Sequence, residues 1–172
     1  ITGSLLTPGS ANTQRLSSLG YITVPSSSTT GNTLTARSAS SLTMTKTSTY
    51  ANQTTAIPQT NSYKIASYSL AGNSSEDVNV DTVSVDFTAV SGATFTSADL
   101  TDVILKVDGV AVGTPKATVS ATSNSFSVSF VLPKNGSKTI ELWANIGSTI
   151  TATHSIKATT TLSGVGASSS VT

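Results

Sequence analysis

His154 is the only histidine in the chain and the first residue to consider for catalysis or metal binding. No cysteine is present, which excludes a thiol nucleophile, an iron–sulfur cluster and a cysteine zinc site. A lone histidine is a poor zinc site. Serine is abundant, but no Gly-x-Ser-x-Gly sequence marks a nucleophile elbow. We therefore expect no enzymatic activity, no metal and no cofactor, and a structural role for His154.

Acidic residues are the second group that could carry chemistry. Five aspartates would be the candidates for a calcium site: Asp81, Asp86, Asp99, Asp102 and Asp108. None of them has the dense Asp-x-Asp-x-Asp spacing of a calcium-binding loop, so we expect roles in turns and at strand edges. The adjacent Glu76 and Asp77 are expected to shape a corner of the chain rather than to act as an acid and base pair.

Covalent modification is a third kind of chemistry. Three Asn-x-Ser/Thr sequons are candidate N-glycosylation sites: Asn52, Asn73 and Asn135. About three are expected by chance in so hydroxyl-rich a chain, so the motif count is uninformative. The N-terminal part also offers many sites for O-glycosylation. Lys64, Lys106 and Lys138 are candidates for an intramolecular isopeptide bond, which would require an asparagine and an acid beside the lysine.

The composition separates a polar arm from a domain. Residues 1–60 contain 26 serines and threonines and residues 61–172 contain 36, while only 10% of all residues are charged. Residues 1–62 carry three basic and no acidic residues, whereas residues 63–172 carry six basic and eight acidic ones. A net charge of +1 without runs of basic residues does not predict a basic surface that would bind nucleic acid. No apolar stretch approaches the roughly 18 to 20 residues of a membrane span.

The arm, residues 1–40, is expected to be extended rather than helical. Proline, glycine and the five hydroxyl residues at 26–30 make a compact helix unfavourable there. Short apolar islands remain, and the clearest, residues 21–24 (YITV), consists of strand formers. We predict that the arm pairs as a strand where a sheet edge is available. The first candidate for this pairing strand, the donor strand, is residues 16–24, with the apolar residues Leu16, Leu19, Tyr21, Ile22 and Val24. Residues 1–6 are the second candidate.

Residues 41–172 show the alternation of apolar and polar residues that is typical of half-buried strands. Short strands with turn signals every 8 to 12 residues favour an all-β, immunoglobulin-like antiparallel β-sandwich of about seven or eight strands. A change of phase between Val80 and Val83 predicts a β-bulge at residues 81–82. The dipeptide at 108–109, Asp-Gly, predicts a two-residue hairpin.

Trp143 departs from the expected core pattern. It is out of phase with the apolar Leu142 and Ala144, so it should face the other side of its strand. Two interpretations remain open: a half-buried aromatic beneath a loop, or part of a contact surface.

Three stretches carry a resemblance to a known family. They are residues 63–78 (YKIASYSLAGNSSEDV), residues 100–113 (LTDVILKVDGVAVG) and residues 126–146, which end in Trp-Ala-Asn-Ile. Their order resembles that of the immunoglobulin-like modules of prokaryotic surface-layer and other secreted filament proteins of the donor-strand type. The resemblance implies an extracellular structural module on the cell surface without catalytic residues.

The segment after Leu162 stops where a further edge strand is expected. A sandwich that lacks a strand leaves unpaired backbone groups. These features lead to the hypothesis that the protein is the subunit of an extracellular filament or pilus, in which copies of the chain join head to tail by β-strand donation. The alternatives are a cell-surface adhesin or carbohydrate-binding module, which would have glycans or other cell surfaces as partners, and a surface-layer lattice module. The arm could also fold back on its own domain.

Overall fold

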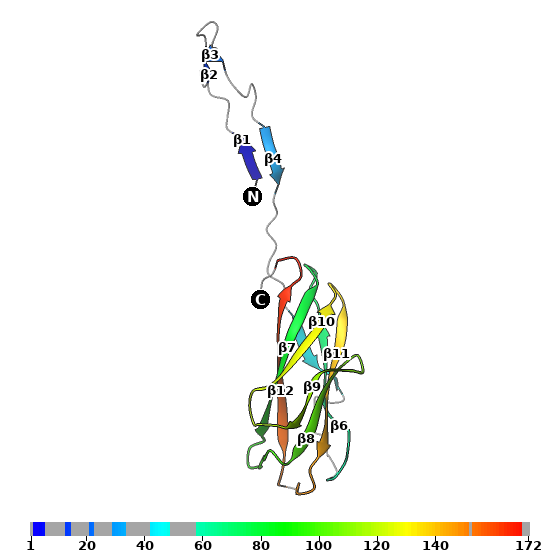
Figure 1. The fold of residues 1–172 in the computed structure, drawn as a ribbon. Coiled ribbons are helices and arrows are strands. Elements are labelled where there is room, and N and C mark those ends of the chain that lie inside the picture. The colour runs from blue at the N-terminus through cyan, green and yellow to red at the C-terminus, as the bar shows by residue number, and fades with distance from the viewer. Residues whose placement is uncertain are drawn as a thin grey trace. The chain divides into compact units, whose positions relative to one another are not determined.

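The computed structural model describes residues 2–5, 13–14, 21–22, 29–33, 42–48, 58–151 and 153–169. The chain divides into two units, Ile1–Ser38 and Ala39–Thr172. Figure 1 shows the strands of both units, and their placement relative to each other is not determined.

The described residues of the first unit form short antiparallel pairs. β1 (Thr2–Leu5) pairs with β4 (Thr29–Thr33), and β2 (Thr13–Gln14) pairs with β3 (Tyr21–Ile22). All described residues of this unit therefore lie in strands.

The described residues of the second unit form eight strands in two antiparallel sheets. The five-stranded sheet has the order β5-β6-β11-β8-β9, and the three-stranded sheet has the order β10-β7-β12. The strands are β5 (Thr43–Lys46), β6 (Tyr63–Ala71), β7 (Val78–Ala89), β8 (Leu100–Val107), β9 (Val110–Thr118), β10 (Asn124–Leu132), β11 (Ser137–Ile146) and β12 (Ile156–Gly166).

The core lies between the two sheets, because the alternating apolar side chains of both face inward. Phe87 and Phe126 fill it from the three-stranded sheet, and Leu105, Ile140 and Leu142 from the five-stranded sheet. Each of these five side chains is at most 1% exposed. The prediction of an all-β fold with antiparallel strands is confirmed.

The predicted bulge is present in β7. Thr82 lies opposite Ser163 of β12, but Val80 lies opposite the next residue, Gly164, so Asp81 is an extra residue in β7. Both Asp81 and Thr82 point away from the core, and this second outward residue returns Val80 and Val83 to the same buried face.

The predicted hairpin joins β8 to β9. Val107 lies opposite Val110, and the two residues between them have positive φ angles, 49° at Asp108 and 82° at Gly109. Two positive φ angles are the requirement of a type I′ turn, which an Asp-Gly pair satisfies at little cost.

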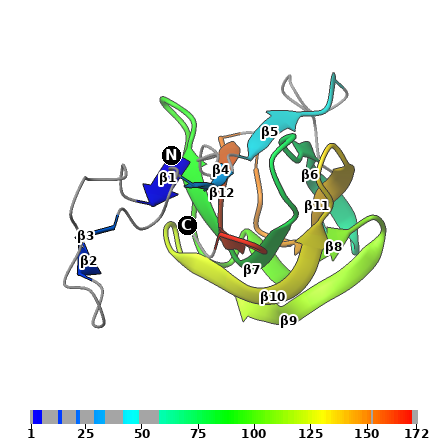
Figure 2. The same cartoon turned by 90° about the horizontal axis from the view of Figure 1, so that it is seen from above.

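The order of strands differs from that of an immunoglobulin constant domain, in which the first strand shares a sheet with the second and the last with the sixth. Here the first long strand, β6, lies beside β11, whereas the last strand, β12, lies beside β7. Figure 2 shows β9 and β10 following each other along one side, where the two sheets meet. On the other side, among the described residues, β12 and β5 end their sheets.

We predict that Gly164→Ala lowers the free energy of unfolding by about 1 to 3 kcal/mol, because overpacking against rigid backbone is destabilising. A Cβ atom at this position would lie 2.5 Å from the Asn79 carbonyl oxygen and 3.0 Å from the Val80 Cα atom. Urea unfolding of the variant measures the effect. The neighbouring exposed substitution Ser163→Ala serves as the control, and equal stability of the two variants would contradict the close approach at the bulge.

Candidate functional site

The outer edge of β12 presents main-chain groups that are not used within its sheet. The Val90 amide donates to the Ser155 carbonyl, which fixes the alternation of hydrogen-bonded pairs along the β7–β12 ladder. Lys157, Thr159 and Thr161 therefore exchange hydrogen bonds with β7. The amide and carbonyl groups of the alternate residues face away from β7: Ile156, Ala158, Thr160 and Leu162. No strand within the described residues pairs with this edge.

One of these outward main-chain groups accepts a hydrogen bond from a side chain of the facing sheet. The hydroxyl group of Tyr68, on β6, donates a 3.1 Å hydrogen bond to the Ala158 carbonyl. Tyr68 is only 4% exposed, so it crosses the interior between the sheets to reach the edge. The molecule thus satisfies the Ala158 carbonyl with its own phenol group.

Thr160, two residues further along β12, has no such partner. Its side chain is buried, with 7% of the residue exposed, and its Oγ1 atom makes no hydrogen bond within the described structure. Buried hydroxyl groups nearly always have a partner, so an unsatisfied one requires an explanation. The sequence indicated strand pairing by the arm, but it did not single out Thr160 or Tyr68.

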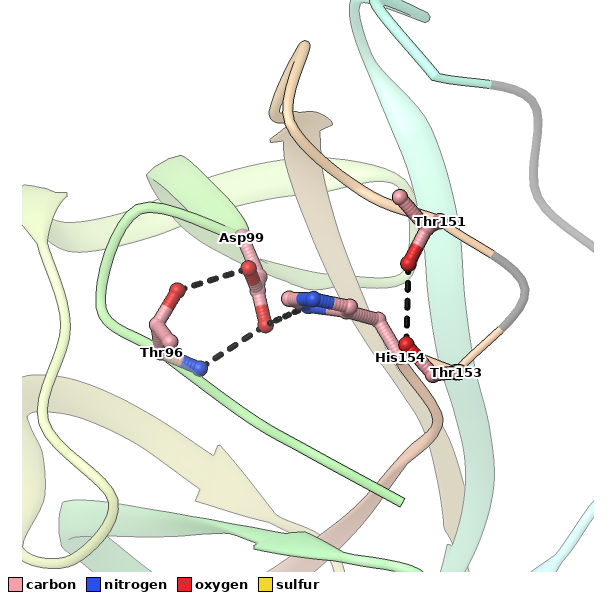
Figure 3. Close-up of polar contacts among 5 residues, drawn as sticks. All are labelled: Thr96, Asp99, Thr151, Thr153 and His154. Atoms are coloured by element: carbon pink, nitrogen blue, oxygen red, sulfur yellow. Dashed lines mark hydrogen bonds and ion pairs between the residues drawn. The ribbon is translucent and has the colours of Figure 1, made fainter.

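The second polar cluster contains the single histidine. His154 Nδ1 lies 2.9 Å from Asp99 Oδ2, and Asp99 also accepts hydrogen bonds from the Thr96 amide and hydroxyl groups (Figure 3). The Thr94 amide donates to the Thr153 carbonyl, which joins the loop after β7 to the loop before β12.

This cluster resembles an acid–base pair without a nucleophile. The hydroxyl groups of Thr151 and Thr153 bond to each other at 2.9 Å, and the His154 Nε2 atom makes no hydrogen bond within the described residues. Burial raises the pKa of Asp99, but the hydrogen bonds from Thr96 and His154 and the charge of His154 more than compensate, so its pKa is lowered. The geometry supports the expected structural role: Asp99 and His154 fasten two loops.

Trp143 lies on the outer face of the five-stranded sheet, as its phase predicted, and is half-buried. The Nζ atoms of Lys106 and Lys64 lie 4.2 Å and 5.2 Å from the centre of its ring. The indole Nε1–H donates to Glu141 Oε2, and Lys64 pairs with the other oxygen of the same carboxylate. These two lysines, the tryptophan and the glutamate form a polar cluster across β6, β11 and β8, in which the cations attract the ring electrostatically.

Two of the three lysines proposed for an isopeptide bond lie beside carboxylates in salt-bridge geometry. Lys64 contacts Glu141, and Lys138 contacts Asp108 at 2.9 Å. The hydrogen bond from Lys64 lowers the pKa of Glu141 against the effect of burial. Hydrogen bonds from the Thr139 amide and then from Lys138 lower the pKa of Asp108.

The acidic corner at Glu76 and Asp77 holds the chain after β12. The carboxylate of Glu76 accepts hydrogen bonds from the Ser168 and Ser169 amides and from the Ser169 hydroxyl group. Asp77 accepts one from the Lys134 amide. Both acids therefore act in turns, as the sequence indicated, and they fix the C-terminal end of β12.

The remaining residues predicted from the sequence are the candidate glycosylation sites and the candidate donor strand. Asn73 and Asn135 lie at one end of the two-sheet unit, where the Asn135 amide donates to the Asn73 carbonyl at 2.8 Å, and Asn135 is exposed. Tyr21 and Ile22 form β3. The other predicted residues lie outside the described residues: Asn52, Leu16, Leu19 and Val24. Within the described part, no three His, Asp or Glu side chains gather in a way that could hold a metal ion.

The three lowered carboxyl pKa values predict a loss of stability in acid. Because Asp99, Asp108 and Glu141 bind protons less readily in the folded state, their contribution is complete above the unfolded-state values of about 3.9 and 4.3 and disappears as the pH falls through the folded-state values. Urea unfolding should give a nearly constant free energy between pH 7 and about 5 and a steep decrease below about pH 4. Glu141→Gln should make this decrease shallower. An unchanged decrease would contradict the contribution of the ionised Glu141 carboxylate to stability.

Comparison of the chain with protein-family models, with curated proteins and with solved structures gave no match. No helix long and apolar enough to cross a membrane occurs among the described residues. The interpretation of function therefore depends on the chain's own geometry, in which no strand of the described residues pairs with the outer edge of β12.

Proposed function

We propose that the protein is a structural subunit of an extracellular filament, in which the arm of one copy pairs as a β-strand with the β12 edge of the next. The outer edge of β12, with which no strand of the described residues pairs, is the observation that carries this proposal. Such a contact joins two different surfaces of the same chain, so it repeats head to tail and generates a filament. The partner is a second copy of the chain, and the location is the cell surface.

The β12 edge lacks the usual protection of an exposed strand. Natural edge strands are often short, or carry prolines and several charges. β12 has 11 residues without proline, and Lys157 is its only charged residue. Of the other strands that end a sheet, β5 has only 4 residues, and β9 and β10 lie beside each other. Length and composition both make β12 the better acceptor of a strand.

The arm is suited to be the donor. Its acid-free sequence can join a sheet without burying negative charge, and its described residues already adopt strand conformation. A two-stranded ribbon is marginally stable alone in water. Opening the β1–β4 or β2–β3 pair should therefore cost little compared with the hydrogen bonds that a full strand forms on β12.

The immunoglobulin-like character of the domain is part of the same proposal. Two facing antiparallel sheets support an immunoglobulin-like sandwich, in a version where the first and last strands have exchanged sheets. A carbohydrate-binding module usually offers exposed aromatic rings, whereas the aromatic side chains between residues 58 and 151 are all buried or half-buried. The ring of Trp143 is also covered by two lysines. The filament interpretation is therefore favoured over the adhesin.

Blocking the β12 edge should abolish filaments while the domain stays folded. Leu162→Pro removes an amide that faces away from β7, so the β7–β12 ladder keeps its bonds, and the proline ring obstructs an incoming strand. We expect monomers by electron microscopy and sedimentation, with a near-native circular dichroism spectrum. Deletion of residues 1–24 should have the same effect, because it removes the donor.

Two matched variants control this experiment. Leu162→Ala removes the same packing but keeps the amide, and Lys46→Pro places a proline at an outward amide of the β5 edge. Both should still form filaments. Filaments of Leu162→Pro that equal the wild type in length and stability would contradict the proposal, as would filaments that persist after deletion of the arm.

A further inference from the structure

We infer that Asn135 is an N-glycosylated residue, whose side-chain amide receives a sugar from a lipid-phosphate-linked oligosaccharide. In this transfer, Nδ2 of Asn135 forms a bond to the anomeric carbon of the sugar and loses a proton. The bond from that carbon to the lipid phosphate breaks, and the lipid phosphate leaves with the electron pair. The inference rests on the extracellular location in the proposed function, because N-glycosylation modifies secreted chains.

Asn135 has the sequence that this modification requires. It is followed by Gly136 and Ser137, so the Asn-x-Ser pattern is complete and has no proline at its middle position. The sequence alone gave the same standing to Asn52 and Asn73. The structure describes Asn73 and Asn135, and it separates these two by their surroundings.

The turn between β10 and β11 presents the Asn135 side chain to solvent. The Gly136 amide donates a 2.8 Å hydrogen bond to the Pro133 carbonyl, and Asn135, the third residue of this turn, has a φ angle of 55°. Asparagine adopts this left-handed conformation more readily than most residues with a side chain. Asn135 and Ser137 are both exposed, and the Asn135 side chain makes no hydrogen bond within the described residues. Both side chains of the sequon are therefore accessible on the folded domain.

Asn73 has less space around it. It is half-buried, and its Oδ1 atom accepts a 2.8 Å hydrogen bond from the Ser75 amide. Ser75, which supplies the hydroxyl group of this second sequon, is also half-buried. A glycan is a bulky group that belongs on the surface of a protein. Exposure therefore favours Asn135 over Asn73.

The Asn135 turn lies at the end of the domain where β12 ends. The Lys134 amide donates to the Asp77 carboxylate, and the Ala167 amide donates to the Asp77 carbonyl. From Leu162 to Ala167 the chain advances about 16 Å if it is extended. A glycan on Asn135 is therefore attached beyond the outward amides of β12, and we expect it to leave assembly through that edge unchanged.

Mass spectrometry of the chain isolated from the cells that produce it tests the inference. We expect a glycan on the peptide that contains Asn135 and none on the peptide that contains Asn73. Ser137→Ala keeps Asn135 but removes the hydroxyl group of its sequon, so the intact chain should lose the mass of the glycan. Ser137→Thr restores a hydroxyl group and should retain the glycan, and Ser75→Ala should not affect it.

Filaments of Ser137→Ala should form at the wild-type critical concentration. Filaments built from chains with unmodified Asn135 would overturn the inference and leave the proposed function intact. A glycan on Asn73, with or without one on Asn135, would overturn the selection of the site by exposure. Glycosylated chains that form no filaments would instead overturn the proposed function and leave the modification of Asn135 intact.

Discussion

The main-chain hydrogen bonds of the three-stranded sheet are the constraint on which the rest of the structure depends. β7 is satisfied on both sides, by β10 and by β12. β10 lies beside β9, where the two sheets meet. β12 has no strand beyond it within the described residues, so the polar groups on its outer side need water, a side chain or another chain. Tyr68 supplies one such side chain from the facing sheet.

The low charge of the chain is consistent with this constraint. A strand that joins a sheet edge next to the core must bring few ions with it, because burial of an unpaired charge is costly. The first 62 residues contain no acid, whereas the carboxylates of the domain act in turns and ion pairs. Asp99 and Glu76 accept hydrogen bonds that hold the loops at the two ends of β12 in place.

The sequence predicted those features that depend on neighbours along the chain. Alternation placed Val80 and Val83 on one face and Trp143 on the other, and the Asp-Gly pair predicted its hairpin. Alternation does not say which strands lie side by side, so the exchanged positions of β6 and β12 could not be predicted. The Tyr68–Ala158 and Asp99–His154 contacts join residues 90 and 55 positions apart, and the unsatisfied hydroxyl group of Thr160 is visible only once that packing is known.

Hydrogen exchange at the β12 amides tests strand donation most directly. Filaments, and monomers from which residues 1–24 have been deleted, would be exchanged in deuterated buffer, dissolved, and compared by NMR residue by residue. We predict that the amides of Ile156, Thr160 and Leu162 exchange rapidly in the monomer and slowly in the filament, while those of Lys157, Thr159 and Thr161 are protected in both. Equal exchange of the outward amides in monomer and filament would contradict the pairing of a donated strand with β12.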